Sequence, residues 1–388
     1  MSELFPEYRA SWETDEHREL RRHVREFLRK ESVPNQERWA AQHMVDREFW
    51  NKMGDAGLLG LDLPEEYGGA GGNFGHAAVV MEEIALAHDT ASGGWAVHAP
   101  IVSHYINAYA AADLKRRWLP KLISGEMVCA IAMTEPGTGS DLQNVRTTAI
   151  REGDEYVING SKTFISNGTH CDLLIIVAKT DPAQGAAGVS LIVAETGDDL
   201  VGFERGRVLE KIGQHGQDTR ELFFSDMRVP AANLLGEQEG LGFYQLMEQL
   251  ARERLILASA CAGIAEAAVL EAIQYTKARE AFGRPLIKFQ NTKFELAECK
   301  TETLAIKTLV DYAIQRYLDG TCDPATASSA KLFAADKSCE IVDRCLQLFG
   351  GYGYMLEYPI ARAYAAARVN RIYGGTSEIM KEIISRSL

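Results

Sequence analysis

The spacing of apolar residues changes character twice along the chain. Between residues 14 and 29, Leu20, Val24 and Phe27 recur at helical intervals among charged residues, which predicts an amphipathic helix. Similar spacing continues to about residue 123, so we expect an all-helical N-terminal domain over residues 1–123.

The second region, residues 124–237, carries short apolar runs instead. Leu173–Ala178 and Val189–Ala194 are rich in Ile and Val, and Gly and Pro interrupt such runs at regular intervals. This pattern predicts strands in a small β-barrel or sandwich. The Asn159-Gly160 pair further predicts a hairpin here, because it suits a tight type I′ turn.

The third region, residues 238–388, returns to helical spacing. Gly242–Phe282 contains no proline and predicts one long helix, which Gly283 and Pro285 end. Further helices are expected at Phe289–Leu318, Pro324–Phe349 and Ile360–Val369. The order of elements indicates an α+β chain whose C-terminal domain is a four-helix bundle.

Composition narrows the function classes. The net charge of −13 offers no positive surface for nucleic acid, and we expect no metal site and no membrane span. The seven scattered cysteines contain no CxxC pair, which suits a reduced compartment. The acidic N-terminus does not resemble a secretory signal, so a cytoplasmic location is expected.

The long predicted helix carries a carboxylate without a local counter-ion. Glu253 lies at the edge of an apolar stripe, and no cationic residue stands three or four positions away, whereas Arg252 has Glu248 four residues before it and predicts an exposed ion pair. Burial would raise the pKa of Glu253 and make it a stronger base. The alternative is a tertiary salt bridge between Glu253 and an arginine of a neighbouring helix.

A glycine-rich segment, Ala132–Leu142, offers backbone N–H groups that could approach a ligand closely. Thr134 and Ser140 add hydroxyl groups to it. On composition alone it could equally be an ordinary loop. No dinucleotide-binding G-x-G-x-x-G pattern follows a predicted strand, and the P-loop pattern is absent.

This segment resembles the flavin- and substrate-binding signature of acyl-CoA dehydrogenases. Five further stretches resemble the same family in the expected order: Lys162–Gly168, Arg279–Gly283, Phe289-Gln290, Gln347–Tyr354 and the C-terminal Gly374-Gly375-Thr376. The resemblance covers nearly the whole chain.

The resemblance implies an FAD site with residues of three kinds. Residues expected to line or cover the isoalloxazine ring are Met133, Thr134, Gly139, Ser140, Phe164, Ile165 and Ser166. Residues expected to hold the diphosphate and adenosine, largely across a subunit interface, are Arg279, Gln290, Gln347, Leu348, Gly350 and Gly351. Thr376, Ser377 and Glu378 are expected to close over the cofactor.

The C-terminal motif departs from most of the family, whose catalytic glutamate directly precedes the Gly-Thr pair. Here that position is Gly374, which cannot take a proton. The long-chain and isovaleryl branches instead carry the base in a Glu-Arg-Leu motif, here Glu253-Arg254-Leu255. The resemblance therefore implies that Glu253 is the base. The expected substrate-binding residues are Ser140, Tyr244, Arg254, Gly374 and Gly375, although Tyr244 could equally pack in the core.

The implied activity is FAD-dependent dehydrogenation of an acyl-CoA to trans-2-enoyl-CoA, a step of fatty acid β-oxidation in lipid metabolism. The expected partners are an electron-transfer flavoprotein and further copies of the chain in a homotetramer. The alternatives are an acyl-carrier-protein dehydrogenase, a monooxygenase-like relative, or a non-catalytic flavin-binding member of the same fold.

Overall fold

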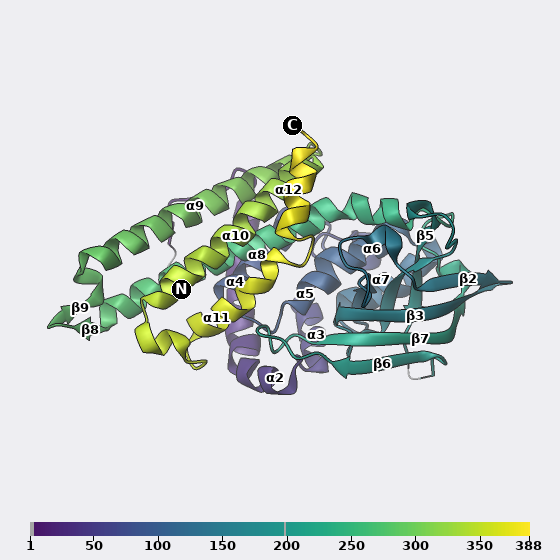
Figure 1. Ribbon diagram of the computed structural model, residues 1–388, viewed down its shortest axis with the longest axis horizontal. Coiled ribbons are helices and arrows are strands. Elements are labelled where there is room, and N and C mark those ends of the chain that lie inside the picture. The colour runs from purple at the N-terminus through teal and green to yellow at the C-terminus, as the bar shows by residue number, and fades with distance from the viewer. Residues whose placement is uncertain (1–3, 198) are drawn as a thin grey trace.

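The computed structural model describes residues 4–197 and 199–388, and it has the three expected parts (Figure 1). A helical N-terminal part leads into a curled sheet, which is followed by a bundle of long helices. The predicted α+β fold class is thereby confirmed.

The N-terminal part consists of short helices, among which α4 is the most deeply buried. The helices are α1 (Asp15–Phe27), α2 (Gln36–Gln42), α3 (Arg47–Asp55), α4 (Phe74–Leu86), α5 (Gly94–Ala96), α6 (Ser103–Tyr109) and α7 (Ala112–Ser124). Nearly every residue of α4 is buried, because α4 lies between α1 and the C-terminal bundle. A π-helical turn over Val97–Val102, with Pro100 inside it, joins α5 to α6.

The middle part is a seven-stranded sheet. Its strands are β1 (Cys129–Ala132), β2 (Thr148–Glu152), β3 (Glu155–Ser166), β4 (Leu173–Lys179), β5 (Val189–Glu195), β6 (Phe203–Val208) and β7 (Thr219–Pro230). They follow the order β1-β4-β2-β3-β7-β6, with β5 paired to β4. Strands β4 and β5 are buried on both faces, which explains their continuous apolar sequences.

The hairpin predicted at Asn159-Gly160 is wrong. Strand β3 runs straight through this pair, and its pairing with β7 shifts register between Ile158 and Gly160. A Cβ at Gly160 would lie 2.5 Å from Thr147 Oγ1, so glycine permits a close approach of the backbone here. The actual turn joins β2 to β3 through Gly153, whose φ of 63° is left-handed, and Asp154.

The C-terminal part is built on α8 (Gly242–Ala278), which ends close to where the sequence predicted. It packs against α4, α9 (Gln290–Leu318) and α10 (Pro324–Gln347). The remaining elements are the two-residue strands β8 (Glu280–Ala281) and β9 (Arg284–Pro285) and the helices α11 (Pro359–Ala367) and α12 (Ser377–Ser385).

Helix α8 corrects the expectation that no segment reaches the length and hydropathy of a membrane span. Among the described helices it alone does so, with a mean hydropathy of 1.8 over its most apolar window. However, 78% of that window is buried inside the protein, as in the core helix of a soluble protein.

Candidate active site

The main cavity, of about 250 Å³, lies where the three parts of the chain meet. Its walls come from α4 and the α5–α6 region, from the ends of β1 and β3, from α8, and from the loop before α12. Seven of the predicted site residues line it, namely Met133, Thr134, Phe164, Ile165, Ser166, Glu253 and Gly374. The fold therefore brings together residues that are as far as 241 positions apart in the sequence, from Met133 to Gly374.

A buried ion pair shapes the glycine-rich loop that carries Met133 and Thr134. Lys162 Nζ lies 2.9 Å from Glu135 Oε1 and also donates hydrogen bonds to the carbonyls of Met133 and Val177. Burial lowers the pKa of Lys162 to about 8 although Glu135 opposes that shift. The pair ties β3 to this loop and fixes the cavity wall that both segments form.

Phe164 adopts an unusual conformation for an aromatic residue. Its φ is 61°, at a bulge where the pairing of β3 with β7 shifts between Lys162 and Ile165. Its side chain is 66% exposed although it lines the cavity. A left-handed, uncovered phenylalanine costs free energy, and such outliers often mark functional sites. Its flat, uncovered ring suits contact with a planar group such as a flavin.

Glu253 lies in the wall of the cavity on α8 and is only 7% exposed. Burial raises its pKa, and the hydrogen bond from Tyr105 and the charge of Arg254 offset part of that rise. Within residues 4–197 and 199–388, no salt bridge reaches Glu253, so the alternative of an arginine partner from a neighbouring helix is wrong.

The predicted exposed pair between Arg252 and Glu248 is also wrong. Arg252 is buried, forms an ion pair with Asp62, and lies close to His104. Glu248 instead accepts a hydrogen bond of 2.7 Å from Tyr109. Helical spacing would allow Arg252 to pair with Glu248. Arg252 pairs instead with the desolvated Asp62, which is 190 positions away in the sequence.

Gly374 lines the main cavity. Among the described residues, nothing accepts a hydrogen bond from its backbone N–H. The next residue, Gly375, accepts a hydrogen bond of 2.5 Å from the buried Lys331 Nζ, which holds the loop in place. Both glycines have positive φ, of 63° and 95°, a backbone conformation that glycine adopts more readily than other residues.

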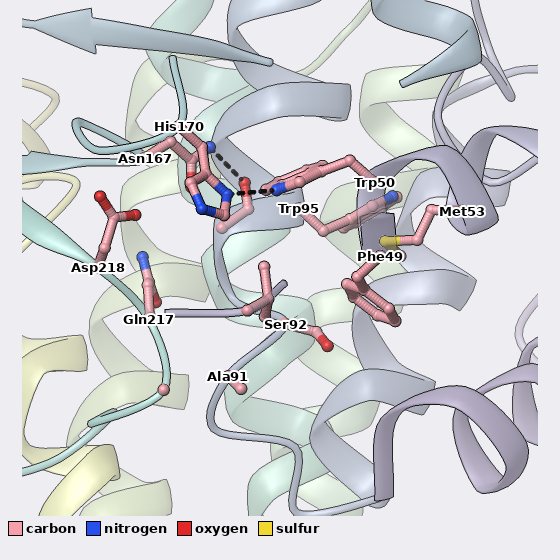
Figure 2. A pocket seen from close by; sticks show the side chains of 13 residues that line it. Phe49, Trp50, Met53, Ala91, Ser92, Trp95, Asn167, His170, Gln217 and Asp218 are labelled. Carbon is pink, nitrogen blue, oxygen red and sulfur yellow. Dashed lines mark hydrogen bonds between the residues drawn. The ribbon is translucent and has the colours of Figure 1, made fainter. Parts of the chain in front are cut away.

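A second, much smaller cavity lies next to Asn167, the residue that follows β3 (Figure 2). Its volume of about 10 Å³ is enough for one water molecule, so it cannot hold a substrate. In its wall, Asn167 donates hydrogen bonds to the carbonyls of Gly94 and Cys129, and Trp50 donates one of 3.3 Å to His170. These bonds fasten the segment after Ser166 to the N-terminal part.

The residues predicted to bind the diphosphate and adenosine form a separate cluster at the other end of α8. Arg279, Gln290, Gln347, Gly350 and Gly351 are exposed there, and Leu348 is half-buried. The Arg279 guanidinium lies 5.8 Å from the centre of the Tyr352 ring. At 1.5 Å per residue, Arg279 is about 39 Å along the helix from Glu253, so the two groups cannot meet within one chain.

The remaining predicted residues lie outside the main cavity. Gly139 and Ser140 are exposed on the loop after β1, and Glu378 is exposed in the first turn of α12. Thr376 caps α12, and Ser377 donates to Asp336 at 2.9 Å. Gly375 and Arg254 neighbour lining residues, and the Nε of the buried Arg254 has no partner among the described residues. Tyr244 is 62% exposed, so neither a place in the acyl pocket nor core packing fits its position.

Sequence reasoning missed several residues of the cavity. Leu257, Ala260 and Ile264 continue the Glu253 face of α8, and their spacing could have identified them. Tyr105, which donates a hydrogen bond of 2.8 Å to Glu253, is 148 positions away and gave no local signal.

Comparisons with known proteins agree with this architecture. Family models described as the N-terminal, middle and C-terminal domains of acyl-CoA dehydrogenase match residues 14–126, 130–227 and 240–388. The chain is 44% identical to the mitochondrial long-chain specific acyl-CoA dehydrogenase of Sus scrofa over 97% of its own length and 87% of that protein.

Several solved structures have folds similar to that of this chain. An acyl-CoA dehydrogenase from Geobacillus kaustophilus has a TM-score of 0.94 and 45% identity, covering 98% of this chain and 99% of that one. A chain from a structure described as the electron transferring flavoprotein of Acidaminococcus fermentans has a TM-score of 0.93 and 36% identity, covering 98% and 99%. A glutaryl-CoA dehydrogenase from Mycobacterium smegmatis in complex with FADH2 has a TM-score of 0.90 and 27% identity, covering 97% and 95%. By sequence and by fold, the chain belongs to the acyl-CoA dehydrogenase family.

Proposed function

We propose that Glu253 is the catalytic base of this FAD-dependent acyl-CoA dehydrogenase. The observation that carries the proposal is a buried carboxylate with a raised pKa in the wall of the main cavity, opposite a glycine at the other family position for the base. A desolvated carboxylate is a stronger base than an exposed one, which suits removal of a proton next to a thioester carbonyl.

The residues around Glu253 suggest how the proton is removed. The acyl chain occupies the apolar part of the cavity, and the thioester carbonyl receives a hydrogen bond from the unpartnered N–H of Gly374. This donor stabilises the negative charge that develops on the carbonyl oxygen as Glu253 takes the α-proton. The product is a trans-2-enoyl-CoA.

The same cavity suits the cofactor. Phe164 offers an uncovered ring, while Met133, Thr134, Ile165 and Ser166 form the adjoining wall. When bound, FAD supplies the acceptor for the hydride that leaves the β-carbon. The burial of the surrounding side chains limits the access of water to the reacting atoms.

We further propose that the complete site needs a second copy of the chain. The Arg279 cluster consists of Arg279, Gln290, Gln347, Leu348, Gly350 and Gly351. Arg279 is about 39 Å along α8 from Glu253, yet this cluster carries the arginine and glutamine side chains that suit a diphosphate and an adenosine. Exposed aromatic and apolar side chains surround this cluster, including Phe282 at 94%, Tyr354 at 84% and Leu356 at 63% exposure. Such a patch favours burial against another subunit, in keeping with a homotetramer.

Electrons would then leave through an electron-transfer flavoprotein, as part of fatty acid β-oxidation. We propose a cytoplasmic location, because all seven cysteines are free and none is paired in the described structure. Fractionation of cells that express a tagged chain, with a marker for each compartment, would test that location.

The activity is tested by anaerobic bleaching of the bound flavin with saturated acyl-CoA. We expect wild-type protein to bleach, and Glu253→Gln to keep its FAD spectrum and bind acyl-CoA but to bleach at least about 1,000-fold more slowly. The matched control is Glu248→Gln, which changes a glutamate on the same helix that bonds Tyr109 instead. Bleaching at the wild-type rate in Glu253→Gln would overturn the assignment of the base.

A further inference from the structure

One tyrosine provides the hydrogen bond that reaches the Glu253 carboxylate. Tyr105 Oη donates to Glu253 Oε1 at 2.8 Å, and the Tyr105 side chain is fully buried. Among the described residues, no other group donates a hydrogen bond to this carboxylate. The second oxygen, Oε2, therefore has no protein donor, as expected of an atom that must accept a proton from substrate.

The segments that carry these two residues are fixed to each other directly beside the contact. Arg252, which precedes Glu253, donates from Nε to the carbonyl of Pro100 at 2.6 Å. The same guanidinium forms a buried ion pair with Asp62. The π-helical turn at Val97–Val102 exposes the Pro100 carbonyl to this interaction, and α6 with Tyr105 follows directly. His104 of α6 lies 2.9 Å from both Asp62 Oδ1 and the Arg252 guanidinium, so these contacts connect α6 to α8.

We propose that Tyr105 is a positioning residue for the base, whose hydroxyl orients the Glu253 carboxylate and stabilises its ionised form. The inference rests on the proposed role of Glu253. The Tyr105 hydroxyl is uncharged and fully buried. Tyr105 can therefore hold the Glu253 carboxylate in place without an ion pair, which would make Glu253 a weaker base.

The charged and titratable neighbours agree with this role. Burial raises the pKa of Glu253, whereas the Tyr105 hydrogen bond and the charge of Arg254 lower it. Burial and the adjacent Glu253 raise the pKa of Tyr105 well above its usual value, so the tyrosine remains a donor throughout the working pH range. The nearby Tyr109 adds a small effect of the same sign on Tyr105. Tyr105 thus opposes the effect of burial on the base.

The test compares two tyrosine variants on the same helix. Tyr105→Phe removes the hydroxyl but keeps the ring, while Tyr109→Phe removes a hydroxyl that bonds Glu248 and not Glu253. Flavin bleaching is measured at saturating acyl-CoA from pH 5 to pH 10. We expect the acid limb of the Tyr105→Phe profile to move up by about one pH unit, the value of one hydrogen bond to a charged group.

The expected pattern separates positioning from general damage. In Tyr105→Phe the rate on the acid limb falls by up to about tenfold and recovers at higher pH, while KM changes little. Tyr109→Phe keeps the wild-type profile. As a readout independent of turnover, the infrared band of the Glu253 carboxyl group, identified by its absence in Glu253→Gln, should titrate at higher pH in Tyr105→Phe.

Each negative outcome has a distinct meaning. A Tyr105→Phe profile that superimposes on wild type, or a rate loss that is equal at every pH, overturns the role of Tyr105. Normal bleaching in Glu253→Gln overturns the assignment of the base itself. If Tyr105→Phe does not retain FAD, Tyr105→Gln and Tyr105→Leu replace it, and a similar profile in this donor and non-donor pair also overturns the inference.

Discussion

Gly374 faces Leu257 across the cavity wall so closely that a Cβ at position 374 would lie 2.2 Å from Leu257 Cδ1. Leu257 stands one helical turn after Glu253 on α8, and Gly374 has a φ of 63°. A side chain at position 374 therefore requires the end of the Leu257 side chain, which lines the same cavity as Glu253, to move.

Gly374→Ala should slow flavin bleaching and lower thermal stability. The left-handed backbone costs an alanine about 1–2 kcal/mol, and the clash with Leu257 displaces the N–H group that we propose as the donor to the thioester. Leu257→Ala in the same chain should restore part of both losses. A double-mutant cycle on the bleaching rate and the unfolding temperature measures the coupling, and strictly additive effects would contradict it.

The length of the apolar channel should set the acyl chains that are accepted. Glu253, Leu257, Ala260 and Ile264 line one cavity along about 16 Å of α8. Beside Ile264, at Gly263, α4 and α8 come close, since a Cβ at Gly263 would lie 2.7 Å from Ala85 Cβ. At about 1.2 Å per backbone bond of an extended chain, this channel accommodates roughly a dozen carbons.

Ala260→Phe should therefore block the channel partway along it. We expect this variant to lose activity with dodecanoyl-CoA and longer substrates by at least about tenfold while it keeps activity with butanoyl-CoA. The short substrate is the control for correct folding and FAD content. The measurement is kcat/KM across acyl-CoAs of graded length, and an equal loss at every length would contradict the prediction.

Stability should fall in mild acid because of one buried histidine. His98 is fully buried, lies 2.9 Å from the Leu122 carbonyl through Nε2 and accepts the Cys129 N–H through Nδ1. Burial lowers its pKa from 6.5 to about 4. Between these values the unfolded chain binds a proton that the folded chain does not, so stability is fully present above pH 6.5 and decreases toward pH 4.

The expected contribution is on the order of 3 kcal/mol across this pH range. It is measured as the urea midpoint at several pH values, followed by tryptophan fluorescence. His98→Gln should be less stable at neutral pH and should show a shallower slope than wild type between pH 6.5 and pH 4. His23→Gln, at an exposed position, should keep the wild-type slope, and equal slopes in both variants would contradict the assignment.

Arg279 should contribute to FAD retention although it lies far from the main cavity. Arg279→Ala should release FAD at least about tenfold more readily, because a guanidinium pairs well with a diphosphate. Arg284→Ala is the matched control, since Arg284 is exposed on the adjoining strand β9 and stacks on Phe289 at 4.2 Å. The measurement is the FAD dissociation constant of each variant. Equal affinities for the two variants would remove Arg279 from the proposed cofactor site.

Much of the fold was predictable because its signals are local. The long helix α8 follows from a run of residues with helical spacing and no proline, and the buried strands β4 and β5 follow from short runs of Ile and Val. The failure at Asn159-Gly160 has a tertiary cause. Strand β7 pairs with β3 on both sides of this dipeptide, so the glycine serves as a bulge and not as a turn.

The site residues that belong to sequence motifs, such as Glu253 and Thr134, were predictable. The contacts between residues that are far apart in the sequence were not. The partner of Arg252 is Asp62 and not Glu248, and the donor to Glu253 comes from Tyr105 on another helix. Helical spacing reports neighbours within one helix, whereas these pairs depend on how α6 and α8 pack together.

The hydropathy of α8 has a consequence for how the protein matures in the cell. An 18-residue window of this helix is as apolar as a membrane-crossing segment, and only the surrounding helices and the sheet conceal it. While a newly synthesised chain is incomplete, α4 is already present but α9 and α10 are not, so one flank of α8 stays uncovered. Nascent chains should then be prone to aggregation and depend on molecular chaperones until the bundle closes.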